Sequence, residues 1–341
     1  MVAPTGGEKD MDAPQLLTIL ESVGKESTQL EKVYFLFDEY IGLNQWEDHF
    51  YISPPIKKRI VKKIAGKSLE LHIEDTLMEN TTYLLSLDNC IKDINEGNVV
   101  EDLQLLYSTS GNVDSLKLSG KLQDAYTLEM VENAWIMLFD ESKNDTIIFK
   151  ETPNYIAKTD KNGNFHFPNL NGENYKMASL TNFDFIYNEG EQIAFSDQLI
   201  NAEQDSFISL LAFDPIVVVD SIVADTLSAL ADSSKTDSVL VGSITYGNLE
   251  IITTENSPCI FQLSQNEKVI SQFVFVAKPY ALNAITPGRY QLKFIDDTDQ
   301  NGEWTTGNWK NKTSAERVVN YPTEITIRAN WDLELEWIIE E

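Results

Sequence analysis

Carboxylate and amide side chains occur at alternating positions near the end of the chain, in the order Asp297-x-Asp299-x-Asn301-Gly302. Oxygen ligands at this spacing, followed by a glycine that permits a tight turn, are typical of Ca²⁺-binding loops. A complete EF-hand loop would have a bidentate glutamate at its twelfth position, where this chain has Asn308. Asp and Asn before Gly are equally typical of a plain β-turn. The sequence therefore leaves two interpretations open, a Ca²⁺ site with Asp297, Asp299 and Asn301 as ligands, and a structural turn.

Basic residues gather in one short segment of a strongly acidic chain. The 341 residues include 26 Lys+Arg and 54 Asp+Glu, which gives a formal net charge of −28. This charge argues against a nucleic-acid partner and against binding to an anionic membrane surface. Six basic residues nevertheless lie close together: Lys57, Lys58, Arg59, Lys62, Lys63 and Lys67. One interpretation is a docking surface for an acidic partner, lipid phosphates or lipopolysaccharide. The other is a solvated hairpin whose lysines protect an edge strand.

Four of the six tryptophans lie in the last part of the chain: Trp304, Trp309, Trp331 and Trp337. Exposed aromatic rings can stack on sugars, whereas buried rings fill a sandwich core. Trp304 and Trp309 flank the acidic loop and are the candidates for surface contacts. Trp331 and Trp337 are six residues apart, which predicts that they share one face of a single strand and belong to the core.

Histidines and cysteines are too scarce and too widely spaced for a zinc or thiol-redox site. The chain has three histidines and two cysteines, Cys90 and Cys259, with no CxxC motif. Both cysteines lie in apolar, strand-like segments, which predicts buried free thiols. No GxSxG, HExxH or glycine-rich phosphate loop is present. The sequence therefore favours a protein that is not an enzyme.

Most of the chain alternates between apolar and polar residues, with Gly, Asn, Asp or Pro about every ten residues. Expected strands include Val33–Phe37, Leu69–Ile73, Thr82–Leu87, Leu116–Leu122, Ala134–Phe139 and Gln272–Val276. Many short strands at this spacing predict an all-β fold of consecutive sandwiches. Residues 217–239 differ, because they lack aromatic residues and glycine and are rich in Asp, Ser and Ala. We therefore expect a flexible tether (1–11), three β-sandwich domains (12–110, 113–216 and 240–341) and an Asp/Ser-rich linker (217–239).

A series of motifs in the first domain resembles a known family. The motifs are, in order, Phe37-Asp38-Glu39-Tyr40-Ile41, Ile52-Ser53-Pro54-Pro55, Gly66-Lys67, Asn80-Thr81-Thr82-Tyr83 and Asp93-Ile94-Asn95-Glu96-Gly97-Asn98. Together they resemble the bacterial Ig-like domain of the S-layer-protein type, as it occurs in Bacteroidota envelope lipoproteins. Residues 159–165, with Leu170 and Tyr175, resemble the carboxypeptidase regulatory-like (transthyretin-like) sandwich. Residues 297–304 and 328–332 resemble the C-terminal part of the same lipoproteins.

The resemblance implies a compartment and two modifications. Such lipoproteins begin at a lipid-modified cysteine before a Pro-Thr-Gly-Gly-like stretch; here Pro4-Thr5-Gly6-Gly7 follows Met1, and we expect an N-terminal lipid anchor as the membrane attachment. Asp-Ser or Asp-Thr before an aliphatic residue resembles the O-glycosylation acceptor of exported Bacteroidota proteins. The candidate acceptors are Ser115, Ser221, Thr226 and Ser238. Asp-Ser and Asp-Thr are also common in the turns of an acidic chain, so both interpretations stay open.

The predicted function follows from this resemblance. It implies a non-enzymatic outer-membrane lipoprotein, on the periplasmic or cell-surface face, that acts as an interaction scaffold or accessory subunit. The expected partner is an outer-membrane β-barrel complex that inserts or exports proteins. The alternative is a glycan-binding module that uses Trp304, Trp309 and the acidic loop. A hydrolase is a third hypothesis, for which the sequence offers no catalytic motif.

Overall fold

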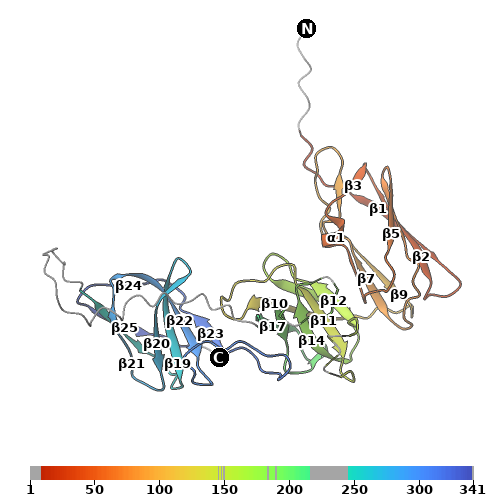
Figure 1. The fold of residues 1–341 in the computed structure, drawn as a ribbon. Coiled ribbons are helices and arrows are strands. Elements are labelled where there is room, and N and C mark those ends of the chain that lie inside the picture. The colour runs from red at the N-terminus through yellow and green to blue at the C-terminus, as the bar shows by residue number, and fades with distance from the viewer. Residues whose placement is uncertain are drawn as a thin grey trace, which may run out of the picture. The chain divides into compact units, whose positions relative to one another are not determined.

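The computed structural model describes residues 9–144, 146, 148, 150–182, 184–188, 190–215 and 245–339. Within these ranges the chain forms 25 strands and one four-residue helix, α1 (Trp46–His49) (Figure 1). The predicted all-β fold class is therefore confirmed. None of the helices described is long and apolar enough to cross a membrane. The predicted linker 217–239, with Ser221, Thr226 and Ser238, lies outside the described residues.

The internal contacts of the chain divide it into two compact units. The first unit comprises residues 1–121, 132–187 and 198–210, and the second comprises residues 122–131, 188–197 and 211–341. The first unit contains the N-terminal sandwich and most of a second one. The second unit contains the C-terminal sandwich together with two short segments from earlier in the chain.

The N-terminal sandwich of the first unit has nine strands: β1 (Leu16–Val23), β2 (Leu30–Phe37), β3 (Ile41–Leu43), β4 (Tyr51–Ser53), β5 (Val61–Ala65), β6 (Ser68–His72), β7 (Thr82–Ser86), β8 (Ile91–Asp93) and β9 (Gln104–Ser108). One sheet has the order β1-β2-β6-β5, another has the order β4-β7-β9, and β3 pairs with β8. Alternate residues of β2, namely Val33, Phe35 and Phe37, are fully buried. This period of two places one face of the strand in the core, as the sequence pattern predicts.

The second sandwich in the first unit is built from β10 (Leu116–Asp124), β11 (Trp135–Asp140), β12 (Tyr155–Lys158), β13 (Asn164–Leu170), β14 (Asn174–Leu180), β16 (Ile200–Asn201) and β17 (Phe207–Ala212). One sheet has the order β13-β10-β17; in the other, β11 lies between β12 and β14. Gly120 on β10 is needed for the close approach of β17. A Cβ atom there would lie 2.2 Å from the carbonyl oxygen of Ile208 and 2.3 Å from the ring of Phe165.

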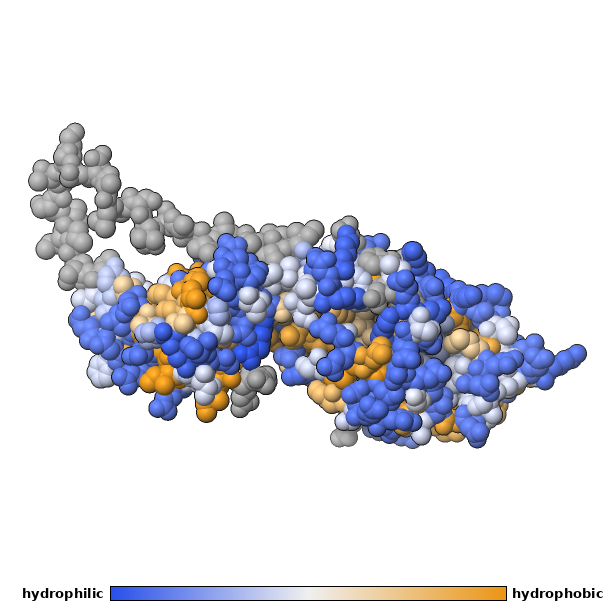
Figure 2. All heavy atoms as spheres, turned by 90° about the horizontal axis from the view of Figure 1, so that it is seen from below, coloured by the Kyte–Doolittle hydropathy of each residue, from blue (hydrophilic) through white to orange (hydrophobic). Residues whose placement is uncertain are grey.

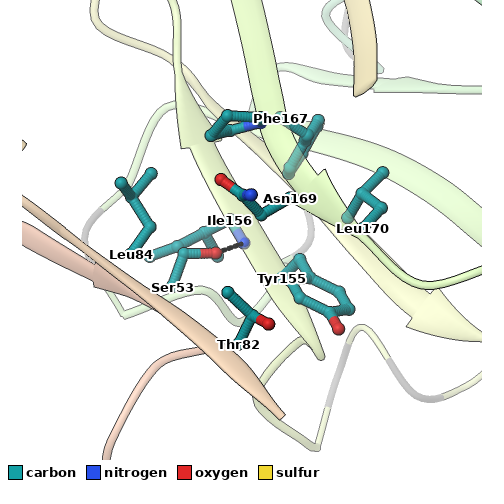
Figure 3. Close-up of a pocket in the computed structure, with 9 residues that line it drawn as sticks. Ser53, Thr82, Leu84, Tyr155, Ile156, Phe167, Asn169 and Leu170 are labelled. Atoms are coloured by element: carbon teal, nitrogen blue, oxygen red, sulfur yellow. Dashed lines mark hydrogen bonds between the residues drawn. The ribbon is translucent and has the colours of Figure 1, made fainter. Parts of the chain in front are cut away.

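Within the first unit, the two sandwiches meet at a joint in which Ser53, Trp135 and Ile156 are buried. Tyr51 and Lys158 are half-buried there, and Asp48 is exposed. The backbone N–H of Ile156, on the edge strand β12, donates a 2.9 Å hydrogen bond to Oγ of Ser53 on β4 (Figure 3). The Lys158 ammonium donates to the backbone carbonyl of Asp48. The rings of Tyr51 and Trp135 pack edge to face with centroids 5.5 Å apart.

A second set of polar contacts lies beside this joint. The N–H of Asp114, in the segment between the sandwiches, donates to Oγ1 of Thr82 at 2.9 Å. Its carbonyl oxygen accepts a 2.6 Å hydrogen bond from the side-chain amide of Asn169. Asn169 and Ser53 also line a cavity of about 10 Å³ (Figure 3). The joint is thus a packed, hydrogen-bonded interface between the two sandwiches.

The second unit contains β15 (Ile193–Phe195), β18 (Gly247–Ile252), β19 (Cys259–Gln265), β20 (Lys268–Phe275), β21 (Tyr280–Ile285), β22 (Gly288–Asp296), β23 (Val318–Asn320), β24 (Ile325–Ile327) and β25 (Asp332–Glu336). One sheet has the order β21-β18-β25 and the other β20-β19-β22-β23, with β24 also pairing with β22. Phe261, Tyr280, Phe294 and Trp337 are among the residues of the core between them.

Two predictions about individual side chains have different outcomes. Cys90 and Cys259 are free and buried, as predicted. Burial raises the pKa of each thiol to about 12. The prediction that Trp331 and Trp337 share one strand face is wrong. β25 spans only Asp332–Glu336, so both tryptophans lie beyond its ends; Trp331 is 57% exposed, whereas Trp337 is buried.

Candidate metal centre between β22 and β23

The acidic loop predicted from the sequence connects two neighbouring antiparallel strands. Ile295 of β22 lies opposite Val318 of β23. The backbone N–H of Asp296 donates to the carbonyl oxygen of Arg317, so the pairing continues past the end of β23. One residue further, the same register places Asp297 opposite Glu316. The two ends of the loop therefore bring together residues that are far apart in the sequence.

Three carboxylates converge at this position. Asp297, Asp299 and Glu316 each have an oxygen within 4.8 Å of the other two. Asp297 is 1% exposed and Glu316 is 6% exposed, whereas Asp299 faces solvent. Within the described ranges, none of the three carboxylates pairs with a lysine, arginine or histidine. The neighbouring Arg317 instead forms ion pairs with Asp296 at 2.8 Å and with Glu255 at 3.3 Å.

Most of the carboxylate oxygens accept hydrogen bonds from the loop itself. Glu316 accepts the N–H groups of Thr298 at 2.7 Å and Thr305 at 2.9 Å. Oδ2 of Asp297 accepts the N–H of Gly302 at 3.1 Å. Oδ1 of Asp297, in contrast, is buried and has no hydrogen-bond partner among the described residues. A buried charged oxygen without a donor is costly, and it distinguishes this site from an ordinary acidic turn.

Asn301, which the sequence motif predicts as a third ligand, makes other contacts. Its Oδ1 accepts the N–H of Glu303 at 2.6 Å, and its Nδ2 donates to Oδ2 of Asp299 at 3.0 Å. The amide therefore orients the Asp299 carboxylate, and its role as a ligand stays a prediction. Glu316 was not identified from the sequence, because it lies far beyond any single calcium-loop motif. The pairing register of the two flanking strands is the signal that could have found it.

The tryptophans of the loop pack against other residues of the second unit, with Trp309 buried and Trp304 half-buried. The indole N–H of Trp304 donates to the backbone carbonyl of Glu316 at 3.0 Å, and its ring packs on Tyr126 at 5.0 Å. Trp309 is only 7% exposed and packs edge to face on Phe195 at 5.1 Å. The prediction that Trp309 offers an exposed ring is therefore wrong, because the loop folds that side chain inward.

The basic segment forms the β5–β6 hairpin expected from one of its two interpretations. Arg59 and Lys62 both contact Oε1 of Glu47 at 2.7 Å, and the hydrogen bond from Lys62 lowers the pKa of Glu47. Lys58 donates to the backbone carbonyl oxygen of Glu74 at 2.9 Å, and Lys67 donates to the backbone carbonyl oxygen of Asp38. Four of the six basic side chains thus bind acceptors within the first unit. A docking role for the segment stays a prediction.

Among the predicted glycosylation sites, the structure describes Ser115. This residue is exposed and lies immediately before β10. Its hydroxyl is thus sterically accessible to a modifying enzyme, and its glycosylation stays a prediction.

Comparison with known protein families finds a match for the N-terminal sandwich. Residues 10–109 match the family model described as a bacterial Ig-like domain. This Ig-like domain contains β1 to β9 and confirms the resemblance to that family. The lipoprotein and transthyretin-like resemblances stay predictions. No curated protein matches the chain.

Several solved structures are similar at low sequence identity. The N-terminal part of the bacterial S-layer protein SbsC is 10% identical over 59% of this chain and 44% of that chain, with a TM-score of 0.20. The Bacillus anthracis TIE protein is 11% identical over 99% and 59%, with a TM-score of 0.19. The minor pilin GBS52 of Streptococcus agalactiae is 13% identical over 66% and 95%, with a TM-score of 0.18. The chain thus spans less than two thirds of the first two proteins, and these values do not support a functional assignment.

Proposed function

We propose that this chain is a non-enzymatic scaffold of a bacterial cell envelope that presents protein-binding sheet edges from a rigid pair of sandwiches. The joint between the two sandwiches of the first unit carries this proposal. The hydrogen bond from Ile156 to Ser53 and the Tyr51–Trp135 contact hold the Ig-like domain against the next sandwich. A flexible linker would suffice if each domain acted alone, whereas a packed joint suits a protein that holds binding surfaces at a fixed spacing.

The Ig-like domain has one sheet edge suited to a protein partner. β1 is an edge strand, and Leu17 and Leu20 on it are each 61% exposed. An edge strand leaves backbone N–H and C=O groups free to pair with an added strand. The opposite edge, β5, includes Lys62 and Lys63, which protect an edge from such pairing. β1 contains no lysine, so it is the edge that we assign to the partner.

The surface in Figure 2 is compatible with a scaffold that has local contact sites. On the face in Figure 2, hydrophilic residues predominate, and the hydrophobic residues form separate patches. Discrete exposed apolar patches can mark interaction sites. We further propose that the protein is an outer-membrane lipoprotein and an accessory subunit of a β-barrel complex. The Ig-like domain and the acidic net charge are compatible with this placement.

Affinity purification from detergent-solubilised envelopes of the native organism tests the proposal. We expect a stoichiometric envelope protein to be recovered with the tagged wild-type chain. The double variant L17K/L20K should lose that partner, because it charges the β1 edge. V113K is the matched control, since Val113 is exposed but lies outside a strand.

Two results would contradict the scaffold function. One is recovery of the chain without any stoichiometric partner after crosslinking. The other is specific retention on a polysaccharide that is lost when Trp304 is replaced by alanine, which would favour the glycan-binding alternative. The intact mass of the natively expressed protein tests the lipid anchor and the glycans in the same preparation.

A further inference from the structure

We propose that Asp297, Asp299 and Glu316 bind one Ca²⁺ ion, which closes the loop between β22 and β23. This site is independent of the scaffold function proposed above. The first argument is electrostatic. Three carboxylate oxygens lie within 4.8 Å of one another, two of the residues are almost fully buried, and no basic side chain in the described ranges neutralises them. Like charges this close in a partly desolvated place repel strongly unless a cation lies between them.

The second argument is the unpaired oxygen. Oδ1 of Asp297 is buried and accepts no hydrogen bond, although Oδ2 of the same carboxylate and both oxygens of Glu316 accept backbone N–H groups. The loop therefore supplies hydrogen-bond donors to Oδ2 of Asp297 and to both oxygens of Glu316, but none to Oδ1 of Asp297. A metal ligand has this arrangement, because its lone pair is directed at the cation.

The distances suit calcium. Ca²⁺–oxygen bonds are about 2.3–2.6 Å long, so two ligands on opposite sides of one ion lie about 4.6–5.2 Å apart. Three oxygens within 4.8 Å of one another are therefore close enough to share one ion. An all-oxygen set without nitrogen or sulfur favours a hard cation. Since Asp299 faces solvent, water can complete the six to eight ligands that Ca²⁺ takes, whereas Mg²⁺ requires shorter bonds and near-ideal octahedral geometry.

Binding would order more than the three ligands. The residues between Asp297 and Glu316 include Trp304, which packs on Tyr126, and Trp309, which packs on Phe195. Oγ1 of Thr306 donates to the carbonyl oxygen of Asp214 at 2.7 Å. All of these partners belong to the second unit. The ion would therefore fix the base of a loop that connects the C-terminal sandwich to earlier segments of this unit.

Calorimetry on the full chain, stripped with chelator and titrated with CaCl₂, tests the site. We expect one ion per chain, a Kd in the range of about 10⁻⁴–10⁻³ M known for extracellular calcium modules, and weaker binding of MgCl₂. The melting temperature should rise with CaCl₂ and fall again with chelator. D297N and E316Q should each bind Ca²⁺ at least ten-fold more weakly. E303Q is the matched control, because it removes one exposed carboxylate from the same loop, and its affinity should not change.

A second measurement covers the case in which D297N does not fold. Tb³⁺ can replace Ca²⁺, and the indole of Trp304, bonded to the backbone of Glu316, should sensitise its luminescence. The signal should be displaced by CaCl₂ and be absent in E316Q and D299N. The proposal is overturned if the wild-type chain shows neither binding heat nor a change in melting temperature. It is also overturned if E316Q and D299N bind Ca²⁺ as tightly as the wild type.

Discussion

Replacing Ser53 by alanine should loosen the joint between the Ig-like domain and the second sandwich. Ser53 is 4% exposed, and its Oγ accepts the N–H of Ile156 at 2.9 Å. β12 is an edge strand of its sheet. In S53A, therefore, this donor has no replacement in the protein. The two residues are 103 positions apart in the sequence, so the bond acts between domains and not within one strand pair.

The magnitude follows from the environment of the bond. A buried N–H left without an acceptor costs about 1–3 kcal/mol. The adjoining cavity of about 10 Å³ approaches the size that holds one water molecule, and the lost hydroxyl enlarges it. Oδ1 of Asn169, which lacks a partner among the described residues, also lines this space and could accept a hydrogen bond from that water. Water entry would therefore move the cost toward the lower end, about 1 kcal/mol.

Hydrogen exchange measures this effect at the residue concerned. A cost of about 1–3 kcal/mol corresponds to an increase of about 5- to 140-fold in the exchange rate of the Ile156 amide, when exchange reports the opening equilibrium. Mass spectrometry of peptides spanning residues 150–160 of the full chain would detect it. S22A is the control: Ser22 lies on β1 and makes no side-chain hydrogen bond among the described residues, so protection should stay within two-fold. If S53A and S22A exchange alike, the joint is not held by this bond.

Three further predictions concern other parts of the chain. Burial lowers the pKa of Lys293 to about 8, so between about pH 8 and the unfolded value of about 10.4 the unfolded chain binds more protons. In urea titrations, the free energy of unfolding of the wild type minus that of K293M should therefore rise with pH in this window; a difference that does not change with pH would contradict the assignment. G120A should destabilise the protein by about 1–3 kcal/mol, because its Cβ overlaps Phe165 and the β17 backbone, and an unchanged melting temperature would refute the packing. Cys90 and Cys259 should resist iodoacetamide at pH 8 in the native protein and react in urea, because burial raises the pKa of both thiols to about 12. Intact mass measures the labelling, and labelling of the native protein would show that the thiols are accessible.

The strands were predictable because their signal is local. Val33, Phe35 and Phe37 alternate in the sequence, and the structure buries all three. The two buried cysteines were predictable for the same reason. Trp331 and Trp337 show the limit of this approach. Their spacing fits one strand face, but β25 is only five residues long, and the sequence gives no sign of where it ends.

The joint and the Trp309 contact were not predictable, because each depends on residues far apart in the chain. Ser53 lies in a motif that identifies the Ig-like family, yet no local pattern connects it with Ile156. Trp309 lies beside an acidic loop, which suggests exposure, but Phe195 and Lys312 cover its ring in the folded chain. Local patterns specify which face of a strand is buried, whereas contacts between domains depend on the fold.

The carboxylate cluster depends both on a local sequence motif and on a long-range contact. The register between β22 and β23 explains why acidic side chains meet there. Asp296 and Arg317 face each other and form an ion pair at 2.8 Å. One position further, the same register sets Asp297 opposite Glu316, and the alternation of strand side chains turns this pair to the other face. The two adjacent cross-strand pairs therefore differ in charge. Asp296 lies opposite a basic side chain, Arg317, whereas Asp297 lies opposite a second acid, Glu316. Like charges directly opposite each other destabilise a strand pair. A divalent cation would supply for Asp297 and Glu316 the positive charge that Arg317 supplies for Asp296, and Asp299, from the part of the motif that the sequence identified, would complete its protein ligands.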